Sequence, residues 1–284
     1  MLKENEKILV TGSRGQLGRE LERLLPHAVL VDIDTLDITD AEAVKNFVRS
    51  QQVTHVINCA AYTAVDQAEE DSDLCRRINV DGVANLARWI PTVIHISTDY
   101  VFDGKGSRPY RADDTPQPAS VYGKTKRAGE LAVLETAQSA AVIRTSWLYS
   151  PWGKNFLNTM LRLGAEKESL SVVNDQWGSP TFAGDLAAAI VMMLPQIAEG
   201  SNEIYHYCNS GICSWADFAA EIMRQANLPC RIDCITTEQY PTRARRPAYS
   251  ALDTAKICDT FGICIPTWQE SLSQCLGRMK ETKK

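Results

Sequence analysis

Strand-like and helix-like segments alternate through the first half of the chain, and this alternation restricts the possible folds more than any other feature. Short runs rich in Val and Ile, among them KILVTGS, HVINCAA and TVIHIST, are separated by segments whose apolar residues recur at helical spacing. The runs are continuously apolar, as expected for strands that are covered on both faces. The pattern therefore predicts an α/β fold of the Rossmann type, built on a doubly wound parallel sheet.

A change of pattern after about residue 150 predicts a second, smaller lobe. We expect residues 1–150 to form a dinucleotide-binding domain, to which elements from about 168–200 return. Residues 151–284 are expected to form mainly a C-terminal α/β lobe that binds the substrate. After residue 227 the chain is expected to be irregular, with several prolines, until a final helix.

Helix boundaries can be predicted at a few places. Residues 73–90 are expected to form one long helix, and LAAAIVMML a buried one. Thr39 is the expected N-cap of a helix over residues 40–51, and Ser214 is the expected N-cap of a helix that follows it. Both side chains can accept a hydrogen bond from the free N–H groups of a first helical turn.

Charge and hydropathy exclude several classes of partner. The formal net charge is −5, with no long basic run before the C-terminal RMKETKK, so we expect no nucleic-acid partner. No apolar run approaches the roughly 20 residues that span a bilayer, and the N-terminal segment lacks the apolar core of a signal peptide. We therefore expect a cytoplasmic protein without a membrane partner.

The spacing of cysteines and histidines argues against disulfides and against a zinc site. The nine cysteines are an odd number without a C-x-x-C pair, and we expect reduced thiols that fill the core. The histidines are isolated, without H-E-x-x-H or mixed His/Cys ligand spacing. The four histidines are His27, His55, His95 and His206.

A glycine loop joins the first expected strand to the first expected helix. TGSRGQLG places Gly12, Gly15 and Gly18 in a G-x-x-G-x-x-G spacing. Glycines there permit a tight turn, a close approach of backbone N–H groups to a pyrophosphate, and close packing of the helix on the strand. The helix N-terminus adds partial positive charge. The loop therefore predicts a dinucleotide site, with a purely structural turn as the alternative.

Two residues near this loop favour different dinucleotides. Asp32 follows Gly12 by 20 residues, ends the second expected strand and would accept from a ribose 2′-OH, which favours NAD. Arg14 lies inside the loop and could pair with a 2′-phosphate, which favours NADP, or it could be a solvated charge. We therefore expect NADPH or NADH, with use of both left open.

Tyr122 and Lys126 form a Y-x-x-x-K motif at the start of an expected helix. The i,i+4 spacing places both side chains on one face, whereas Lys124 at i+2 points away and is expected to be solvated. An ammonium beside the phenol would lower the tyrosine pKa from about 10 and make Tyr122 a usable proton donor. A surface helix with a chance Tyr/Lys pair is the alternative.

Small and polar residues end two of the expected strands. Ser97 and Thr98 lie at the C-terminal end of one strand, which is the edge where open α/β sheets bind ligands. NCAAYT ends the preceding strand with small residues that would let a cofactor lie against the backbone, and Asn79 lies on the helix after it. Thr98 and Tyr122 are therefore expected to face one site.

These features resemble the extended short-chain dehydrogenase/reductase superfamily. The shared motifs are TGSRGQLG, the N-x-A-A segment, a Ser/Thr before the tyrosine, Y-x-x-x-K, and an asparagine on the fourth helix. Within the superfamily, LDITD, CAAYTAVDQAE, STDYVFDG, VYGKTKRAGE, RTSWLY, NFLNTMLRLG, VVNDQWGSPT and RRP resemble the dTDP-4-dehydrorhamnose reductase family. The motifs run in this order from residue 8 to about residue 270, and that order is specific to the family.

The resemblance implies a role for each matching residue. Tyr122 would protonate O4 of a 4-keto-6-deoxy sugar while hydride reaches C4, Lys126 would hold the nicotinamide ribose, and Thr98 would hydrogen-bond the substrate oxygen. Asp99 and Trp147 would contact the sugar nucleotide, although Trp147 taken alone reads as a core aromatic. With the glycine loop, the residues expected at the cofactor are Gly12, Arg14, Gly15, Gln16, Leu17, Gly18, Asp32, Asp37, Ile38, Ala60, Ala61, Tyr62 and Lys126.

RARRP is the densest cationic cluster of this acidic chain apart from the C-terminal tail. Guanidinium forks suit phosphate oxygens better than single ammonium charges do. Arg245 and Arg246, with Arg243 beside them, are therefore expected to bind the diphosphate of the substrate. A solvated basic loop is the alternative.

A metal is not expected. Some members of the reductase family are described as dimers bridged by Mg²⁺ through glutamates, and Glu20 occupies one plausible ligand position. In SPTFAGDLA, where a second carboxylate would be expected, Gly184 is followed by Asp185. The sequence therefore supports no Mg²⁺ site, and it leaves a monomer and a homodimer open.

Other functions remain alternatives to a sugar-nucleotide reductase. An epimerase or dehydratase of the same superfamily would recycle the hydride, but dehydratases commonly carry Asp-Glu after the catalytic threonine, and here Asp99 and Tyr100 follow Thr98. A non-catalytic regulatory relative is a different class. The presence of Thr98, Tyr122 and Lys126 together argues against it.

Overall fold

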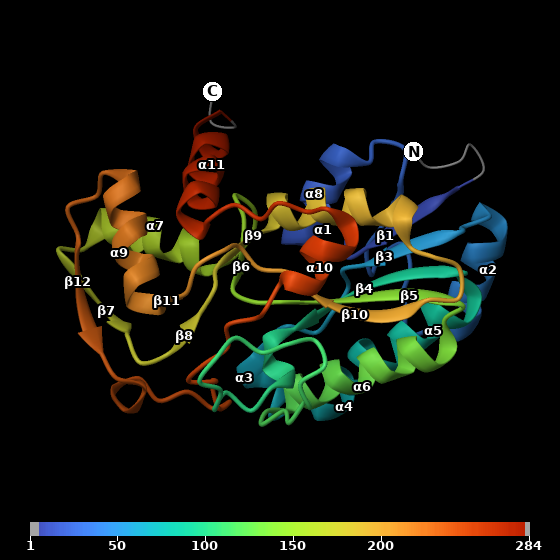
Figure 1. Cartoon of the computed structure of the whole chain (residues 1–284), viewed down its shortest axis with the longest axis horizontal. Helices are drawn as coiled ribbons and strands as arrows, with labels where there is room; N and C mark the ends of the chain where they lie inside the picture. The colour runs from blue at the N-terminus through green and yellow to red at the C-terminus, as the bar shows by residue number, and fades with distance from the viewer. Residues whose placement is uncertain (1–5, 282–284) are drawn as a thin grey trace.

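The computed structural model of the chain describes residues 6–281. Residues 1–5 and 282–284, the latter part of the basic C-terminal run, lie outside the described residues. Six parallel strands form the central sheet in the order β10-β5-β4-β3-β1-β2 (Figure 1). This sheet confirms the predicted fold class. Its strands are β1 (Ile8–Thr11), β2 (Val29–Val31), β3 (His55–Asn58), β4 (Thr92–Thr98), β5 (Ser139–Thr145) and β10 (Asn202–His206).

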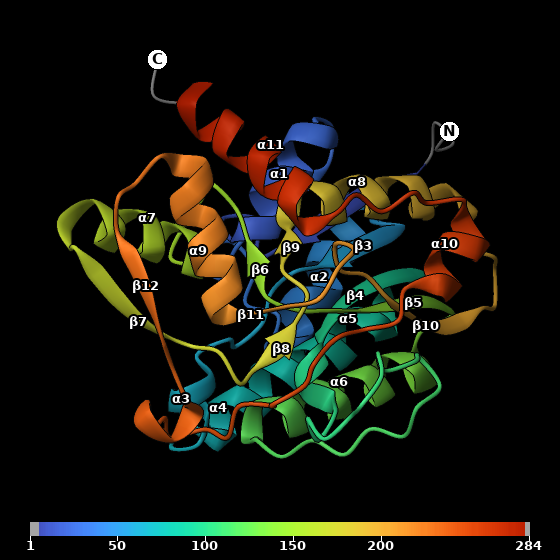
Figure 2. The same cartoon turned by 60° about the vertical axis from the view of Figure 1, so that its left-hand side comes forward.

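Helices cover both faces of the sheet, as a doubly wound fold requires (Figures 1 and 2). One face packs against α1, α8 and α10 through a core that contains Val10, Ile57 and Ile94. The other face packs against α2, α5 and α6 through a core that contains Leu9 and Val56. The bounds are α1 (Gln16–Leu24), α2 (Ala41–Gln51), α5 (Val83–Trp89), α6 (Val121–Thr136), α8 (Ala183–Met193) and α10 (Ala255–Phe261).

The expected long helix over residues 73–90 is interrupted by a wider turn. The segment consists of α4 (Ser72–Arg76), a π-helical turn (Arg77–Gly82) and then α5. Such turns are rare and frequently lie at functional sites. Here the turn carries Asn79, whose amide binds both backbone groups of Tyr62 in the loop after β3.

Two of the predicted helix starts can be compared with the structure. Asp40, not Thr39, caps α2, because the Asp40 carboxylate accepts from the N–H groups of Glu42 and Ala43. Ser214 caps α9 as predicted, in a capping box in which Ser214 and Asp217 bind each other's backbone N–H groups. The helix at LAAAIVMML is buried as expected.

A second lobe lies beside the sheet and has its own aromatic core (Figure 2). Its parallel pair β7–β12 and two shorter pairs are covered by α7, α9 and α11. We expected an irregular chain after residue 227, and this prediction is partly wrong, because β12 and α10 form there. Both elements are short, and β12 is stabilised by pairing with the distant β7. The bounds are β6 (Leu148–Tyr149), α7 (Phe156–Glu166), β7 (Ser169–Val173), β8 (Trp177–Gly178), β9 (Thr181–Phe182), β11 (Cys213–Ser214), α9 (Trp215–Ala226), β12 (Arg231–Ile235) and α11 (Trp268–Glu281).

Segments from beyond residue 150 also join the central sheet. β10 extends it beside β5, and α8 packs on α1. The predicted division into domains at residue 150, with elements from 168–200 returning, stays a prediction. The remaining short elements are α3 (Val65–Ala68) and three 3₁₀ turns at Asp99–Val101, Leu194–Gln196 and Thr237–Gln239.

Two further expectations concern cysteines and membranes. All nine cysteines are free, but Cys234 and Cys264 are exposed, so not every thiol fills the core as expected. Among residues 6–281, no helix has both the length and the apolar character needed to cross a bilayer.

Candidate active site

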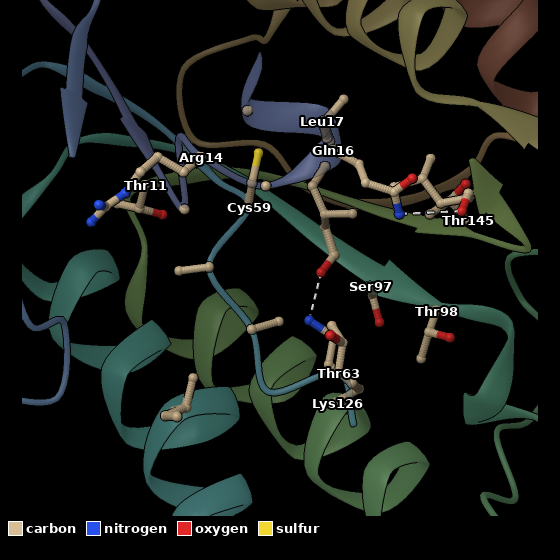
Figure 3. Close-up of a pocket in the computed structure, with 18 of the residues that line it drawn as sticks. Thr11, Arg14, Gln16, Leu17, Cys59, Thr63, Ser97, Thr98, Lys126 and Thr145 are labelled. Carbon is tan, nitrogen blue, oxygen red and sulfur yellow. Dashed lines mark hydrogen bonds between the residues drawn. The ribbon is translucent and has the colours of Figure 1, made fainter. Parts of the chain in front are cut away.

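A cleft of about 790 Å³ opens at the carboxyl edge of the central sheet (Figure 3). The strand ends of β1, β3, β4 and β5 contribute to it, together with the start of α1 and one face of α6. This is where ligands bind in open α/β sheets. The predicted site residues that line it are Gly12, Arg14, Gly15, Gln16, Leu17, Gly18, Asp32, Asp37, Ile38, Ala60, Ala61, Thr98, Asp99, Tyr122, Lys126 and Trp147.

The glycine loop approaches the β3 loop so closely that a side chain would not fit. Gly12 has a φ of +63°, and a Cβ there would lie 2.8 Å from the backbone nitrogen of Ala60. Gly15 is the N-cap of α1, and the first turn that follows has no acidic side chain to compete for its N–H groups. The start of α1 therefore presents backbone donors and partial positive charge to the cleft. That arrangement suits a pyrophosphate.

Asp32 stands at the end of β2 with both carboxylate oxygens engaged by backbone. It accepts from the N–H of Ile33 at 2.9 Å and from the N–H of Arg14 at 3.0 Å. Burial by itself would raise the pKa of Asp32, but these bonds and the Arg14 charge outweigh it and lower the pKa. The Arg14 guanidinium forms an ion pair with Asp34 and is 58% exposed. Both residues thus lie where an adenine ribose is expected, with the Arg14 guanidinium beside the carboxylates of Asp32 and Asp34.

Tyr122 lies in the first turn of α6, with its side chain buried against the cleft. Ser120 caps this helix by accepting from the N–H of Gly123. Burial raises the pKa of Tyr122, and a hydrogen bond with Thr98 opposes the rise in part. The prediction that Lys126 lowers the pKa of Tyr122 is therefore wrong for this structure. The sequence placed the two groups on one helix face but could not show how deeply the phenol is buried.

Lys126 is buried one turn further along α6 and points under the cleft. Its Nζ donates to the carbonyl oxygen of Ile96 at 2.6 Å and lies 3.4 Å from Nε2 of His95. Burial lowers its pKa to about 8, against the opposing charges of Glu130, Cys59 and Cys75. Figure 3 shows Lys126 on the side of the cleft opposite Gln16 and Leu17. Lys124 is exposed, as predicted.

The helix that carries these two residues is pressed against its neighbours. A Cβ on Gly123 would overlap the carbonyl oxygen of Tyr100, and a Cβ on Gly129 would overlap that of Asn79. The backbone of α6 therefore touches the backbone of the β4 loop at one point and the π-helical turn at another. These contacts fix the height of Tyr122 and Lys126 above the sheet.

Thr98 ends β4 beside Tyr122, and Asp99 begins the 3₁₀ turn that follows. The Thr98 hydroxyl donates to Oδ1 of Asp99 at 3.0 Å and accepts from the N–H of Tyr100. Burial raises the pKa of Asp99 to about 6, which the hydrogen bond from Thr98 partly opposes. The Tyr100 ring meets that of Tyr122 edge to face. Polar atoms suited to a substrate oxygen therefore surround the phenol.

Trp147 forms the wall of the cleft that belongs to the second lobe. It adopts a φ of +48°, which is unusual for a large side chain, and its ring stacks on Trp215 at 3.6 Å between centroids. Its carbonyl oxygen accepts from the N–H of Thr181. Trp147 is thus both packed and exposed to the cleft, so the two interpretations of this residue are compatible.

Three predicted residues lie elsewhere. Tyr62 does not line the cleft, because Asn79 holds its backbone and its ring packs in a small cluster behind Tyr122. Arg246 binds Asp66 at 2.6 Å and the Tyr100 hydroxyl at 2.9 Å, outside the main cleft. Arg245 is exposed beside it, with no hydrogen-bond or ion-pair partner among the described residues. Long-range pairing with Asp66, which the sequence pattern does not reveal, decides the position of this loop.

Several lining residues escaped the sequence analysis. Thr145 ends β5 and Ser146 follows it, at the same edge as Thr98, so the strand-end rule used for β4 would have found them. Cys59 could have been found in the same way at the end of β3. Lys154, in the loop before α7, carries no local signal.

The two carboxylates considered for a metal have other partners. Glu20 is buried and accepts from Arg23, Arg278 and the indole N–H of Trp152. Asp185 accepts from Asn209 and from the Ser271 hydroxyl. No group of three potential metal-ligating side chains occurs within residues 6–281.

Comparison with known proteins decides the family. The model of the RmlD substrate binding domain matches residues 6–281. The chain is 40% identical to a dTDP-4-dehydrorhamnose reductase of Aggregatibacter actinomycetemcomitans, over 94% of this chain and 97% of the relative. It is 42% identical to the spore coat polysaccharide biosynthesis protein SpsK of Bacillus subtilis, over 95% and 96%.

A solved structure agrees. The dTDP-4-dehydrorhamnose reductase of Bacillus anthracis, in complex with NADP, superposes with a TM-score of 0.91 at 37% identity, over 96% of this chain and 99% of that one. The chain belongs to the dTDP-4-dehydrorhamnose reductase family. The resemblance stated from the sequence is thereby confirmed. The cleft of this chain brings together the glycine loop, Thr98, Tyr122 and Trp147.

Proposed function

We propose that the protein reduces the 4-keto group of dTDP-4-dehydro-L-rhamnose to give dTDP-L-rhamnose, with NADPH or NADH as the reductant. The observation that carries this proposal is the convergence of Thr98, Tyr122 and Lys126 with the glycine loop in one cleft. Family membership over the whole described chain supports it. The product is a precursor for polysaccharide synthesis.

The residues present fit a dinucleotide. Gly12 lets the loop after β1 lie in direct backbone contact with the loop after β3, where a Cβ would clash, and α1 offers free N–H groups beside it. Asp32 and Arg14 would hold the adenine ribose, while Ile38 and Ala60 would lie against the bound group. When bound, the nicotinamide supplies a hydride to C4 of the sugar. The mixed Asp32 and Arg14 pair supports use of either dinucleotide.

Tyr122 is the proposed proton donor. Burial raises the pKa of Tyr122, so the phenol keeps its proton at neutral pH and can give it to O4. Thr98 would hold the substrate oxygen beside the phenol by donating to it the hydroxyl proton that it gives to Asp99 in this structure. Lys126 would hold the nicotinamide ribose. Burial sets the pKa of Tyr122 in the free protein, but once the proton has left, an ammonium one helical turn away would favour the phenolate.

This role gives Lys126 a pH signature. Its pKa is lowered to about 8, so the side chain is an ammonium below that pH and a neutral amine above it. The rate of reduction is therefore expected to fall as pH rises through about 8. A pH profile of kcat at saturating substrate measures this, and a rate that stays level to about pH 10, the usual lysine pKa, would contradict it.

The decisive experiment is a stoichiometric assay. Purified protein is incubated with dTDP-4-dehydro-L-rhamnose and either NADPH or NADH, and dinucleotide oxidation is compared with sugar product. One dinucleotide oxidised per dTDP-L-rhamnose formed supports the proposal. Isomerised sugar without net oxidation would place the chain among the epimerases, and no turnover with bound dinucleotide would favour a regulatory relative.

We also propose a cytoplasmic enzyme that acts as a monomer or a homodimer without nucleic-acid or membrane partners. The net charge of −5 and the free thiols support this proposal. Residues 151–284 would form mainly the substrate lobe, with Trp147 at its border.

A further inference from the structure

A row of buried polar side chains lies under the cleft, where hydrophobic residues would be expected. Thr11, Asn58 and His95 are direct partners in the register of β1, β3 and β4, so they share one face of the sheet. Each is no more than 1% exposed. Two residues earlier, the same strands carry Leu9, Val56 and Val93, which form the apolar core.

The row is continuous from the glycine loop to α6. The Thr11 hydroxyl lies 2.6 Å from Oδ1 of Asn58, and the amide nitrogen Nδ2 of Asn58 lies 3.1 Å from Nδ1 of His95. Nε2 of His95 then lies 3.4 Å from Nζ of Lys126. Buried polar groups are costly unless each finds a partner, so the members of this row depend on one another.

We propose that His95 is a positioning residue for the reduction. With Asn58 and Thr11 behind it, His95 holds the Lys126 side chain in place and supports its ammonium form. The inference rests on the proposed function of Lys126 and adds His95 and Asn58, which do not line the cleft, together with Thr11, which does. The His95 ring itself stays neutral, because burial and the nearby Lys126 charge hold its pKa well below the usual range.

The hydrogen-bonding capacity of the row supports both charge states of the amine. An ammonium can only donate, so Nε2 must accept from it and the ring proton then lies on Nδ1. The Asn58 amide oxygen must then face Nδ1, which a half-turn of the amide provides, and Thr11 accepts from the amide nitrogen. In the orientation described above, with the amide nitrogen facing Nδ1, the ring proton lies on Nε2 and the neutral amine accepts it.

Other groups near Lys126 act on its charge as well. Glu130 lies on the same helix, while Cys59 follows β3 and Cys75 belongs to α4; all three favour the ammonium. His95 is the group that approaches Nζ from β4, and Ile96 offers a carbonyl oxygen from the same strand. Replacing His95 by an apolar residue would remove one acceptor and add desolvation, and both changes favour the neutral amine.

The first test uses the tautomer of His95 in the cofactor-free protein. With four histidines in the chain, ¹⁵N-labelled ring signals can be assigned by comparison with His95→Gln. The expected result at about pH 6.5 is a neutral ring with its proton on Nδ1, whose signals move as pH passes the lysine pKa of about 8. Lys126→Met should abolish that movement.

A ring proton on Nε2 at this pH would overturn the proposal, as would ring signals that pass the same range unmoved. Because no turnover is measured, this outcome is independent of whether the proposed reaction is correct.

The second test is kinetic and uses three variants. His95→Leu should lower kcat about 10-fold and move the alkaline limb of its pH profile to lower pH, because the ammonium loses its acceptor. His95→Gln should restore much of the activity, since its amide oxygen can accept from Nζ. Val93→Ala, two residues earlier on the same face, loosens the same strand without touching Lys126 and should leave the limb in place. An alkaline limb in His95→Leu that matches Val93→Ala would reduce His95 to a packing role.

Discussion

The two ends of the cleft are built in different ways. The dinucleotide end consists mostly of main chain, with the glycine loop, the start of α1 and the small residues after β3 in direct contact. The end proposed to bind the substrate is built from large side chains that come from distant parts of the sequence, such as Trp147 on Trp215, with Arg246 on Tyr100 just outside the cleft. On the proposed function, backbone geometry would govern cofactor binding, and long-range side-chain packing would govern substrate binding. Variants should separate the two.

The largest effect is expected at the junction of the two ends. Tyr122→Phe removes the proposed proton donor and should lower kcat by about 10³-fold or more, as loss of a general acid commonly does. Dinucleotide affinity should change little, because the ring remains. Steady-state kinetics and fluorescence titration with NADPH measure the two. Tyr205→Phe, in the core on the other face of the sheet, is the control. A wild-type kcat in Tyr122→Phe would remove this residue from the mechanism.

Next in size is a change to the backbone of the dinucleotide end. Gly12→Ala places a Cβ 2.8 Å from the Ala60 nitrogen at a φ of +63°, so the loop must shift. We expect NADPH affinity to fall at least 10-fold, measured by titration calorimetry, because the N–H groups no longer approach the pyrophosphate closely.

The matched control is Gly200→Ala, which has a φ of +78° with nothing within 4 Å of the added Cβ. That variant should lose about 1–2 kcal/mol of stability from the left-handed conformation alone and keep its affinity. Equal NADPH affinity in both variants would show that the close approach has no functional importance.

A smaller effect is expected from side-chain packing at the substrate end. Trp215→Leu removes the ring that supports Trp147, so the KM for the sugar nucleotide should rise several-fold while NADPH affinity stays constant. Trp89→Leu provides the control for loss of an indole, because Trp89 lies on α5, packs against the core of the sheet face that α5 covers, and does not line the cleft. Should NADPH affinity fall as much as sugar affinity in Trp215→Leu, the two ends would not be separable.

The smallest effect is expected at the arginine loop. Arg246→Ala breaks the contacts to Asp66 and Tyr100 and should raise the substrate KM more than Arg245→Ala, which loses only an exposed charge. For Arg245→Ala we expect the substrate KM to rise at most about 3-fold. Because salt screens an exposed charge, this rise should be smaller at high ionic strength. A larger effect in Arg245→Ala than in Arg246→Ala would favour Arg245 of the two as the predicted diphosphate contact.

The same contrast explains what could be predicted from the sequence. The sheet, the glycine loop and the Tyr122–Lys126 pair depend on local spacing, and the structure contains all three. The exposed side chain of Lys124 also follows from helix geometry alone. These are features in which residues near one another in the chain determine the outcome.

The sequence reveals less where distant residues decide. Arg246 pairs with Asp66, and Asn79 binds the Tyr62 backbone, while the ligand contacts predicted for Arg246 and Tyr62 stay predictions. The raised pKa of Tyr122 depends on burial by several elements, and no pattern within α6 reveals it. The N-cap of α2 was predicted at Thr39 but lies at Asp40, one residue later. Either side chain can accept from the N–H groups of a first helical turn, so the local pattern does not decide between them.

The two glycines of α6 that contact neighbouring main chain, Gly123 and Gly129, have one more consequence. At Gly123 and Gly129 the helix rests on the main chain of the turn after β4 and of the π-helical turn, so its distance from these two segments does not depend on the volume of a side chain at either glycine. Changes in the apolar core beneath it, such as Val133 against Val93, can alter how much free energy holds the fold together without moving the phenol or the amine. Core substitutions can therefore change the stability of the fold without changing catalytic alignment, whereas substitutions at the two glycines would change both.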